Sequence, residues 1–195
     1  MSLKKKSAIF IPVILTGILI SAASSSKADA VERVGLNTSD TVMHYLKHNK
    51  TALSKQELDC LTKNIYFEAS NQSIDGQVAI AFVTLNRLND PRFPRTICGI
   101  ISQVLPIHQM KYGVKKSCQF SWYCTHRFSN PNRKSKEWRI ATKAAISAHY
   151  MHQKGYDTTN GATHFHAVHT RPYWACIFKK VAHIDDHVFY KWSKI

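Results

Sequence analysis

The sequence predicts an α+β domain that is mostly helical and carries a small antiparallel sheet near its C-terminus. Three long segments, the last ending at Gln153, repeat apolar residues at the spacing of an amphipathic helix. After the turn signal Asn160-Gly161, the pattern changes to short runs rich in aromatic and β-branched residues. Helices that precede strands, rather than alternate with them, are typical of the α+β class.

Residues 1–30 have the three parts of a secretory signal peptide. Lysines at positions 4–6 are followed by an apolar run over residues 8–20 and by small residues ending in Ala28-Asp29-Ala30. The alternative is a retained membrane anchor, but the apolar run is shorter than the ~20 residues of a spanning helix. We therefore expect cleavage and export to the periplasm, the cell envelope or the medium.

The rest of the chain has room for one domain. We expect residues 31–52 to form a polar lead-in with at most a short helix, and residues 53–195 to form the domain, which acts as a monomer. The chain carries a formal net charge of +15 at pH 7, which favours a polyanionic partner. An exported protein meets wall polymers and lipid headgroups, so nucleic acid is not expected, and membrane contact is expected only through an uncleaved signal peptide.

The first helix of the domain has a clear start signal. Ser54 and Glu57 form a capping box, in which the serine hydroxyl accepts from the Glu57 amide and the Glu57 side chain reaches back to the Ser54 amide. This helix should run to about Ser70. The remaining expected elements are helices over residues 74–88, 96–104 and 136–153, a long structured loop over residues 108–133, and strands over residues 162–168 and 186–192.

Five cysteines follow the signal peptide: Cys60, Cys98, Cys118, Cys124 and Cys176. In an oxidising compartment they can form two disulfides at most, which leaves one thiol over. The trio of Cys98, Cys118 and Cys124 is the expected source of one bridge, while the full connectivity stays open.

Glu68 is the acidic residue whose place in the helical pattern is unusual. It follows Leu61 and Ile65 at the spacing i, i+4, i+7 and so lies within roughly 20° of Leu61 on the apolar face. A carboxyl placed there loses hydration, and its pKa rises toward the range that a general acid needs. The ordinary alternative is a solvated or ion-paired surface residue.

The segments Ile65–Ser70 and Gly76–Arg87 resemble motifs of the SleB/CwlJ cell wall hydrolase family, which includes spore cortex-lytic enzymes. The resemblance covers about Asp59 to Trp192. It departs at Ser70-Asn71-Gln72, where family members often have Arg-Gly-Glu, and at Cys176, where a proline is expected. Further similar segments, in order, are Asp90–Ile101, Cys118–Cys124, Gly161–His166, Pro172–Ala175 and His187–Tyr190.

The resemblance implies a lysozyme-like α+β fold and cleavage of the β-1,4 bond between N-acetylmuramic acid and N-acetylglucosamine in peptidoglycan. The family's catalytic glutamate, in its Y-x-E-A motif, falls on Glu68. Glycosidases commonly use two carboxylates, but Asp75 and Asp185 are the only further candidates and neither stands out. We therefore expect a lytic transglycosylase, or else a muramidase, that needs neither cofactor nor metal.

Other side chains are expected to hold the sugars, because flat aromatic faces suit pyranose rings and polar groups bind hydroxyl and acetamido groups. The two histidines among them share one strand face, since side chains alternate along a strand. Core packing is the alternative for two of the aromatic residues, Tyr66 and Phe120. The aromatic candidates are Tyr66, Phe120, Tyr173 and Trp174, and the polar ones are Gln119, Ser121, His164 and His166.

Two other functions remain as alternatives. The first is a zinc-dependent amidase or endopeptidase that acts on the peptide stems, although no H-E-x-x-H motif and no cysteine pair with zinc-site spacing is present. The second is a basic module that binds peptidoglycan without cleaving it. The histidines that could serve as zinc ligands are His164, His166, His169, His183 and His187.

Overall fold

The computed structural model describes residues 38–104, 118–125 and 130–192. The predicted signal peptide over residues 1–30 lies outside these ranges, and so do the start of the lead-in and parts of the predicted loop over residues 108–133. Within the described part, helices come first and a three-stranded antiparallel sheet follows, so the predicted α+β class is confirmed.

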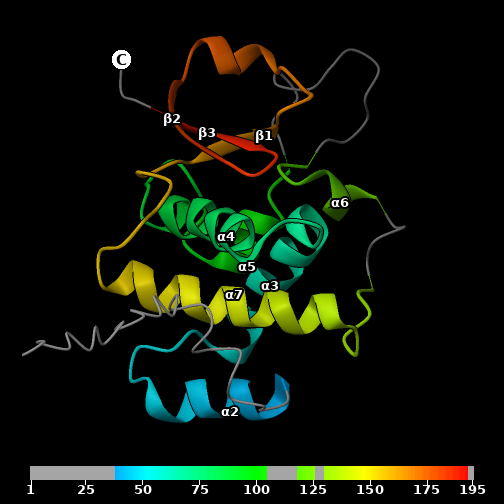
Figure 1. The fold of residues 1–195 in the computed structure, drawn as a ribbon. Coiled ribbons are helices and arrows are strands. Elements are labelled where there is room, and N and C mark those ends of the chain that lie inside the picture. Colours follow the sequence, from blue (N-terminus) through cyan, green and yellow to red (C-terminus); the bar gives the residue numbers. More distant parts are fainter. Residues whose placement is uncertain (1–37, 105–117, 126–129, 193–195) are drawn as a thin grey trace, which may run out of the picture. The chain divides into compact units, whose positions relative to one another are not determined.

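Three long helices form the centre of the fold: α3 (Lys55–Ala69), α4 (Ile74–Leu88) and α7 (Lys136–Gln153). The predicted bounds of the second and third of these are confirmed. Helix α7 packs against both α3 and α4 (Figure 1). No helix in the described part of the chain has the length and apolar character needed to cross a membrane.

The core between these helices follows the predicted apolar stripes. Leu61 and Ile65 of α3 and Phe82 of α4 are fully buried. Helix α7 contributes small residues at these positions, which lets its backbone approach the other helices closely. Its buried alanines are Ala141, Ala144, Ala145 and Ala148.

The capping box predicted two hydrogen bonds between Ser54 and Glu57, and the structure has one of them. The Glu57 amide donates to Ser54 Oγ at 3.1 Å, as expected. Its carboxylate accepts from the amides of Ile97, at 2.5 Å, and Cys98, at 3.4 Å, rather than reaching back to Ser54. These amides begin α5 (Ile97–Ile101) and have no partner inside that helix. The carboxylate therefore joins α3 to α5.

Two disulfides pin the helical part. Cys60–Cys98 links α3 to α5, next to the Glu57 contact. Cys118–Cys124 closes the short helix α6 (Ser121–Cys124) against the residues before it. The second bridge falls within the predicted trio, which confirms that prediction, and Cys176 keeps a free, exposed thiol.

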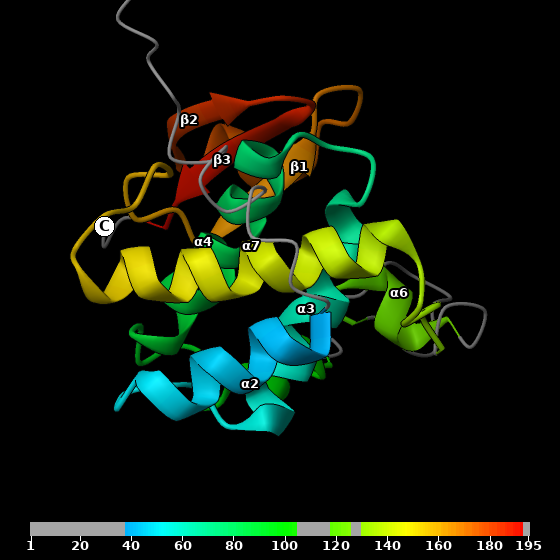
Figure 2. The same ribbon diagram turned by 60° about the horizontal axis from the view of Figure 1, so that its bottom comes forward.

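The described part of the lead-in contains one helix, as the sequence analysis allowed. Helix α2 (Thr38–His48) makes about three turns and packs against α7 (Figures 1 and 2). Tyr45 is buried, and its hydroxyl accepts from the Leu53 amide at 2.9 Å and bonds His149 Nδ1 at 2.7 Å. Tyr45 therefore joins α2 to α7, which carries His149.

The sheet has the strand order β1-β3-β2, with β1 (His164–Ala167), β2 (Lys179–Ile184) and β3 (His187–Lys191). The two strands predicted over residues 162–168 and 186–192 are β1 and β3, with shorter bounds. The sequence did not predict β2, an exposed edge strand whose pairing is irregular between Lys180 and Ala182.

The two faces of the sheet have different partners. On one face, Phe189 is fully buried against Ala79, Ile80 and Val83 of α4. The other face meets residues around the 3-10 helix η3 (Tyr173–Cys176), where His164 and His166 both contact Trp174.

We predict that Tyr45→Phe lowers the free energy of unfolding by about 1–3 kcal/mol, because the Leu53 amide and His149 lose a buried partner. Urea unfolding of the parent and the variant measures this difference. Tyr150→Phe, at an exposed position of α7, is the matched control and should leave stability unchanged. Equal stability of Tyr45→Phe and the parent would mean that the hydroxyl does not hold α2 in place.

We also predict that acid destabilises the fold through His164. Burial, together with the charges of Arg87 and Arg92, lowers the pKa of His164 to about 3. In the unfolded chain this histidine is protonated below about pH 6.5, whereas in the folded chain it stays neutral there. Stability should therefore fall as the pH drops below about 6.5, by about 2 kcal/mol between about pH 8 and pH 5 for this residue alone.

The test is denaturant unfolding at these two pH values. His164→Phe should reduce the acid-induced loss, whereas the other buried histidines contribute equally in both proteins. The same pH dependence in parent and variant would contradict the prediction.

Candidate active site

A cavity of about 620 Å³ opens beside the C-terminal half of α3. Tyr66, Phe67 and Glu68 line it from α3, and Ser121 and Trp122 line it from α6. The described residues after α6, around Asn130, complete the wall. Of the described residues that line this cavity, Glu68 alone carries a carboxyl group.

Glu68 has the environment of a neutral acid. Its side chain is partly exposed to the cavity, and no other described residue forms a hydrogen bond or close ion pair with its carboxyl. Burial of the rest of the group raises its pKa to about 7, while the positive charge of Arg87 opposes that rise. The carboxyl is therefore substantially protonated at neutral pH and free to meet a ligand atom.

The cavity wall opposite Glu68 is held by a buried polar chain. Trp122 Nε1 donates to Asn64 Oδ1 at 3.2 Å, and Asn64 Nδ2 donates to Thr84 Oγ1 at 3.2 Å. The Trp122 ring packs on Phe67, with ring centroids 4.7 Å apart. Asn64 lies one helical turn before Glu68, so α3 positions both the acid and the aromatic wall.

Sequence reasoning missed Asn64 and Trp122. A signal was present for Asn64, because a polar side chain four residues before Glu68 falls on the same apolar stripe and must find a partner there. No comparable signal pointed to Trp122, whose position depends on how α6 folds back onto α3.

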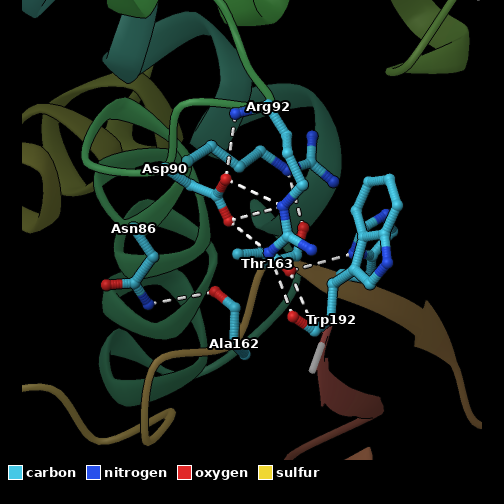
Figure 3. A network of polar contacts seen from close by, with 8 residues as sticks. Asn86, Asp90, Arg92, Ala162, Thr163 and Trp192 are labelled. Atoms are coloured by element: carbon cyan, nitrogen blue, oxygen red, sulfur yellow. Dashed lines mark hydrogen bonds and ion pairs between the residues drawn. The ribbon is translucent and has the colours of Figure 1, made fainter. Parts of the chain in front are cut away.

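The end of α4 is tied to the sheet close to this site. Asn86 Nδ2 donates to the Ala162 carbonyl at 3.0 Å (Figure 3). Arg92 pairs with Asp90 and also donates to the Trp192 carbonyl at 3.0 Å (Figure 3). These contacts fix the helical layer against the starts and ends of the strands.

Arg87 belongs to the same junction and is fully buried. Its Nε donates to the Thr163 carbonyl at 2.6 Å. Its guanidinium carbon lies 5.1 Å from the Phe93 ring centroid and 5.2 Å from that of Phe120. The cation is thus held between two aromatic rings, and its charge reaches Glu68.

The structure brings only some of the predicted sugar-binding residues to Glu68. Tyr66 and Ser121 line the cavity with it. The expectation that Phe120 offers its ring to a sugar is wrong, because the ring is 2% exposed and packs against Arg87. Gln119 does not line the cavity, and its backbone amide donates to the backbone carbonyl of Gln103 at 2.9 Å.

The other four predicted residues lie outside this cavity, with His164 and His166 on β1 and Tyr173 and Trp174 in η3. His164 and His166 share a face, as predicted, and their ring centroids lie 5.3 Å and 5.8 Å from that of Trp174. His166 Nε2 bonds the Tyr190 hydroxyl at 3.1 Å. Tyr173 is 72% exposed. None of these side chains lines the Glu68 cavity.

Neither a zinc site nor a second catalytic carboxyl is apparent in the described part of the chain. No three of its His, Cys, Asp and Glu side chains are grouped so that they could hold a metal ion. Asp185 caps the start of α4 by accepting from the Ser73 amide at 2.9 Å and the Ser73 hydroxyl at 2.6 Å. Asp75 does not line the cavity.

Two solved structures share this fold. One is the catalytic domain of the germination-specific lytic transglycosylase SleB from Bacillus anthracis, with a TM-score of 0.54, 24% identity, and coverage of 72% of this chain and 98% of that one. The other is the catalytic domain of the Bacillus cereus SleB protein, with a TM-score of 0.53, 24% identity, and coverage of 72% and 94%.

Curated relatives include spore cortex-lytic enzymes. That of Bacillus subtilis is 44% identical over 52 residues, which are 27% of this chain and 17% of the relative. That of Oceanobacillus iheyensis is 42% identical over 48 residues, which are 25% of this chain and 17% of the relative. The matched part is thus a small fraction of each relative's length.

The sequence profile of the family described as Cell Wall Hydrolase matches residues 71–190. This match covers more than half of the chain and begins just after Glu68. It contains α4, α5, α6, α7, β1, β2 and all but the last residue of β3. The protein belongs to the cell wall hydrolase family, as its motifs predicted.

Proposed function

We propose that the protein cleaves the glycan strands of peptidoglycan as a lytic transglycosylase, with Glu68 as both acid and base. The observation that carries this proposal is the partly buried Glu68 carboxyl, the one carboxyl among the described residues that line a 620 Å³ cavity, whose pKa burial raises to about 7. Membership of the cell wall hydrolase family and the likeness to spore cortex-lytic enzymes support a wall glycan as the substrate.

The proposed reaction uses the Glu68 carboxyl twice, first as an acid and then as a base. Protonated Glu68 donates to the oxygen that links N-acetylmuramic acid to N-acetylglucosamine, and the bond from that oxygen to the muramoyl anomeric carbon breaks. The Glu68 carboxylate then accepts the proton of the muramoyl C6 hydroxyl, whose oxygen attacks the same carbon. The products are a 1,6-anhydromuramoyl end and a free N-acetylglucosamine hydroxyl, and Glu68 is protonated again.

The absence of a second carboxyl among the described cavity residues favours this route over hydrolysis. Most glycoside hydrolases use a second carboxylate, as the base that activates water or as the nucleophile. An intramolecular hydroxyl makes that group unnecessary, because the attacking oxygen is already part of the substrate. Muramidase activity is the alternative outcome of the same cavity.

Tyr66 and Ser121 would contact the sugar next to the scissile bond, and their position in the cavity wall with Glu68 supports this role. Trp122 adds an aromatic wall that the sequence did not predict. Tyr173 and Trp174 lie outside the cavity, and a role for them requires a longer glycan that continues over the sheet.

The setting of the reaction is the wall outside the cytoplasm. Residues 1–30 would direct export to the periplasm or cell envelope, and the net charge of +15 would favour a polyanionic wall. The enzyme would act as a monomer without metal or cofactor.

We predict that the purified protein releases anhydromuramoyl ends from peptidoglycan and that Glu68→Gln lowers the rate by at least about 10²–10⁴-fold. The amide keeps the shape of the side chain but cannot donate the proton. Mass spectrometry of the digests measures the products. Glu137→Gln, at an exposed position of α7, is the control and should remain active.

Each other outcome has a distinct meaning. Reducing ends would make the enzyme a muramidase. Equal activity of Glu68→Gln and the parent would contradict the choice of acid. Binding of peptidoglycan with no cleavage by either protein would indicate a non-catalytic binding module.

We further predict that EDTA leaves the cleavage rate unchanged, because the described His, Cys, Asp and Glu side chains form no group that could hold a metal ion. The measurement is the same digest with and without the chelator. Loss of activity that zinc restores would favour the amidase or endopeptidase alternative, whose products are cut in the peptide stems rather than in the glycan.

A further inference from the structure

A second cavity, of about 580 Å³, adjoins the one that holds Glu68, because the side chain of Trp122 lines both of them. Helix α3 contributes Gln56, Cys60 and Lys63 to this second cavity, and Tyr123 joins Trp122 from α6. The proposed reaction assigns no role to it. The rest of its lining comes from α5 and the residue that follows, namely Cys98, Gly99, Ile101 and Ser102.

The two cavities follow one another along one face of α3. Four residues of this helix are spaced i, i+4, i+7 and i+11, which places them on one side of it: Gln56, Cys60, Lys63 and Phe67. The first three line the second cavity, and Phe67 lines the first. The helix rises by about 12 Å from Cys60 to Glu68. A ligand that fills both cavities therefore extends along α3.

Aromatic rings connect the first cavity with the second. The Trp122 ring packs on Phe67, with centroids 4.7 Å apart, and meets the Tyr123 ring edge-on, with centroids 5.9 Å apart. Trp122 is held in place because its Nε1 donates to the buried Asn64. Tyr123 is 47% exposed. The second cavity therefore offers an accessible aromatic ring beside a fixed one.

The walls of the second cavity are fastened to each other. The Cys60–Cys98 disulfide forms part of the lining and joins α3 to α5. Beside it, the Glu57 carboxylate accepts from the amides of Ile97 and Cys98. The cavity is thus built into the helical layer, and a ligand would meet walls that are already formed.

Lys63 is the one charged side chain among the described residues that line the second cavity. Its Nζ lies 3.3 Å from Asp59 Oδ2. Asp59 is also held by Arg133, whose Nη2 donates to Oδ2 at 3.0 Å and whose Nη1 donates to Oδ1. Two cations thus share one carboxylate, which leaves one positive charge in excess. Lys63 is able to pair with an anionic ligand while Asp59 keeps Arg133.

We propose that the second cavity binds the acidic peptide stem of a muramoyl sugar, with Lys63 pairing with a stem carboxylate and Tyr123 packing on the stem. This inference rests on the proposed function and adds a binding site for the same substrate. The muramoyl sugar that reacts must place its anomeric carbon beside Glu68 in the first cavity. Its stem is attached to that same sugar through the lactyl group, so the adjoining cavity is within the stem's reach.

The chemistry of the lining favours a stem over a further sugar. A stem combines carboxylates, short apolar side chains and backbone amides. Lys63 suits the carboxylates, and the Tyr123 ring suits the apolar groups. The Gln56 amide and the Ser102 hydroxyl suit the backbone amides. N-acetylglucosamine is uncharged and would leave Lys63 unused.

The first experiment measures binding without cleavage. An N-acetylmuramoyl tripeptide, which has no glycosidic bond to cut, is titrated into the ¹⁵N-labelled protein and followed by NMR. The backbone amide signals of Gly99, Ser102 and Tyr123 should shift. The same compound with its carboxylates amidated should bind about three- to tenfold more weakly, because Lys63 loses its partner.

Variants of Lys63 show whether its charge causes this preference. Lys63→Gln should bind the free and the amidated compound with nearly equal affinity, and Lys63→Arg should restore the preference. Lys55→Gln, at an exposed position of α3 outside both cavities, is the matched control and should behave as the parent. The inference is overturned if the second cavity's signals do not shift, if the parent binds both compounds equally, or if Lys63→Gln keeps the parent's preference.

The second experiment tests the same preference during cleavage. Soluble glycan strands with stems are compared with strands whose stems an amidase has removed. The parent should show a KM about three- to tenfold lower for strands with stems, at similar kcat, and Lys63→Gln should lose most of this difference. Equal KM values of the parent for the two substrates would contradict stem binding.

The two proposals fail in different ways. If the parent cleaves neither kind of strand, the proposed function is wrong, while the NMR titration still reports stem binding. If the parent cleaves both kinds equally and the muramoyl peptide leaves the second cavity's signals unshifted, the function stands and the stem site is wrong. Should Lys63→Gln not fold, the free and the amidated compound still give a decision with the parent alone.

Discussion

The site depends on how the end of α4 is fastened to the sheet. Arg87 reaches the Thr163 carbonyl and Asn86 reaches the Ala162 carbonyl just before β1 begins. These bonds satisfy backbone oxygens just before β1, and they hold the Arg87 cation in the interior. The charge of Arg87 also lowers the pKa of Glu68, although burial of that carboxyl has the larger, opposite effect.

Interactions that would stabilise the Glu68 carboxylate in the fold would also make Glu68 a poorer proton donor at neutral pH. A hydrogen bond or close ion pair to Glu68 would favour the charged form and lower its pKa, which would remove the proton that the reaction needs. The fold instead leaves the carboxyl without such a partner among the described residues and keeps the cation at a distance. The two disulfides and the Glu57 bridge to α5 stabilise the helices, and none of these contacts involves the Glu68 carboxyl.

Local patterns predicted the elements, and distant contacts decided the details. The helices over residues 74–88 and 136–153 were predictable because each has a regular apolar stripe and clear end signals. Glu68 was predictable because a carboxyl interrupts such a stripe. The burial of Phe120 and the contact of Glu57 with Ile97 were not, since both depend on packing across more than thirty residues of chain. The edge strand β2 was missed because lysines and a bulge obscure its alternation.

The departure from the family pattern at Ser70-Asn71-Gln72 has a structural explanation in this chain. Gln72 stands where family members often have glutamate, and its side chain is used on both sides: Nε2 donates to Asp186 Oδ2 at 3.2 Å, and Oε1 accepts from the Asp186 amide at 3.1 Å. A glutamate there would set two carboxylates against each other at the turn between β2 and β3. The amide thus secures this turn to the segment just after α3, and Glu68 is separately the one carboxyl among the described cavity residues. A site built this way suits a reaction in which the substrate supplies its own nucleophile.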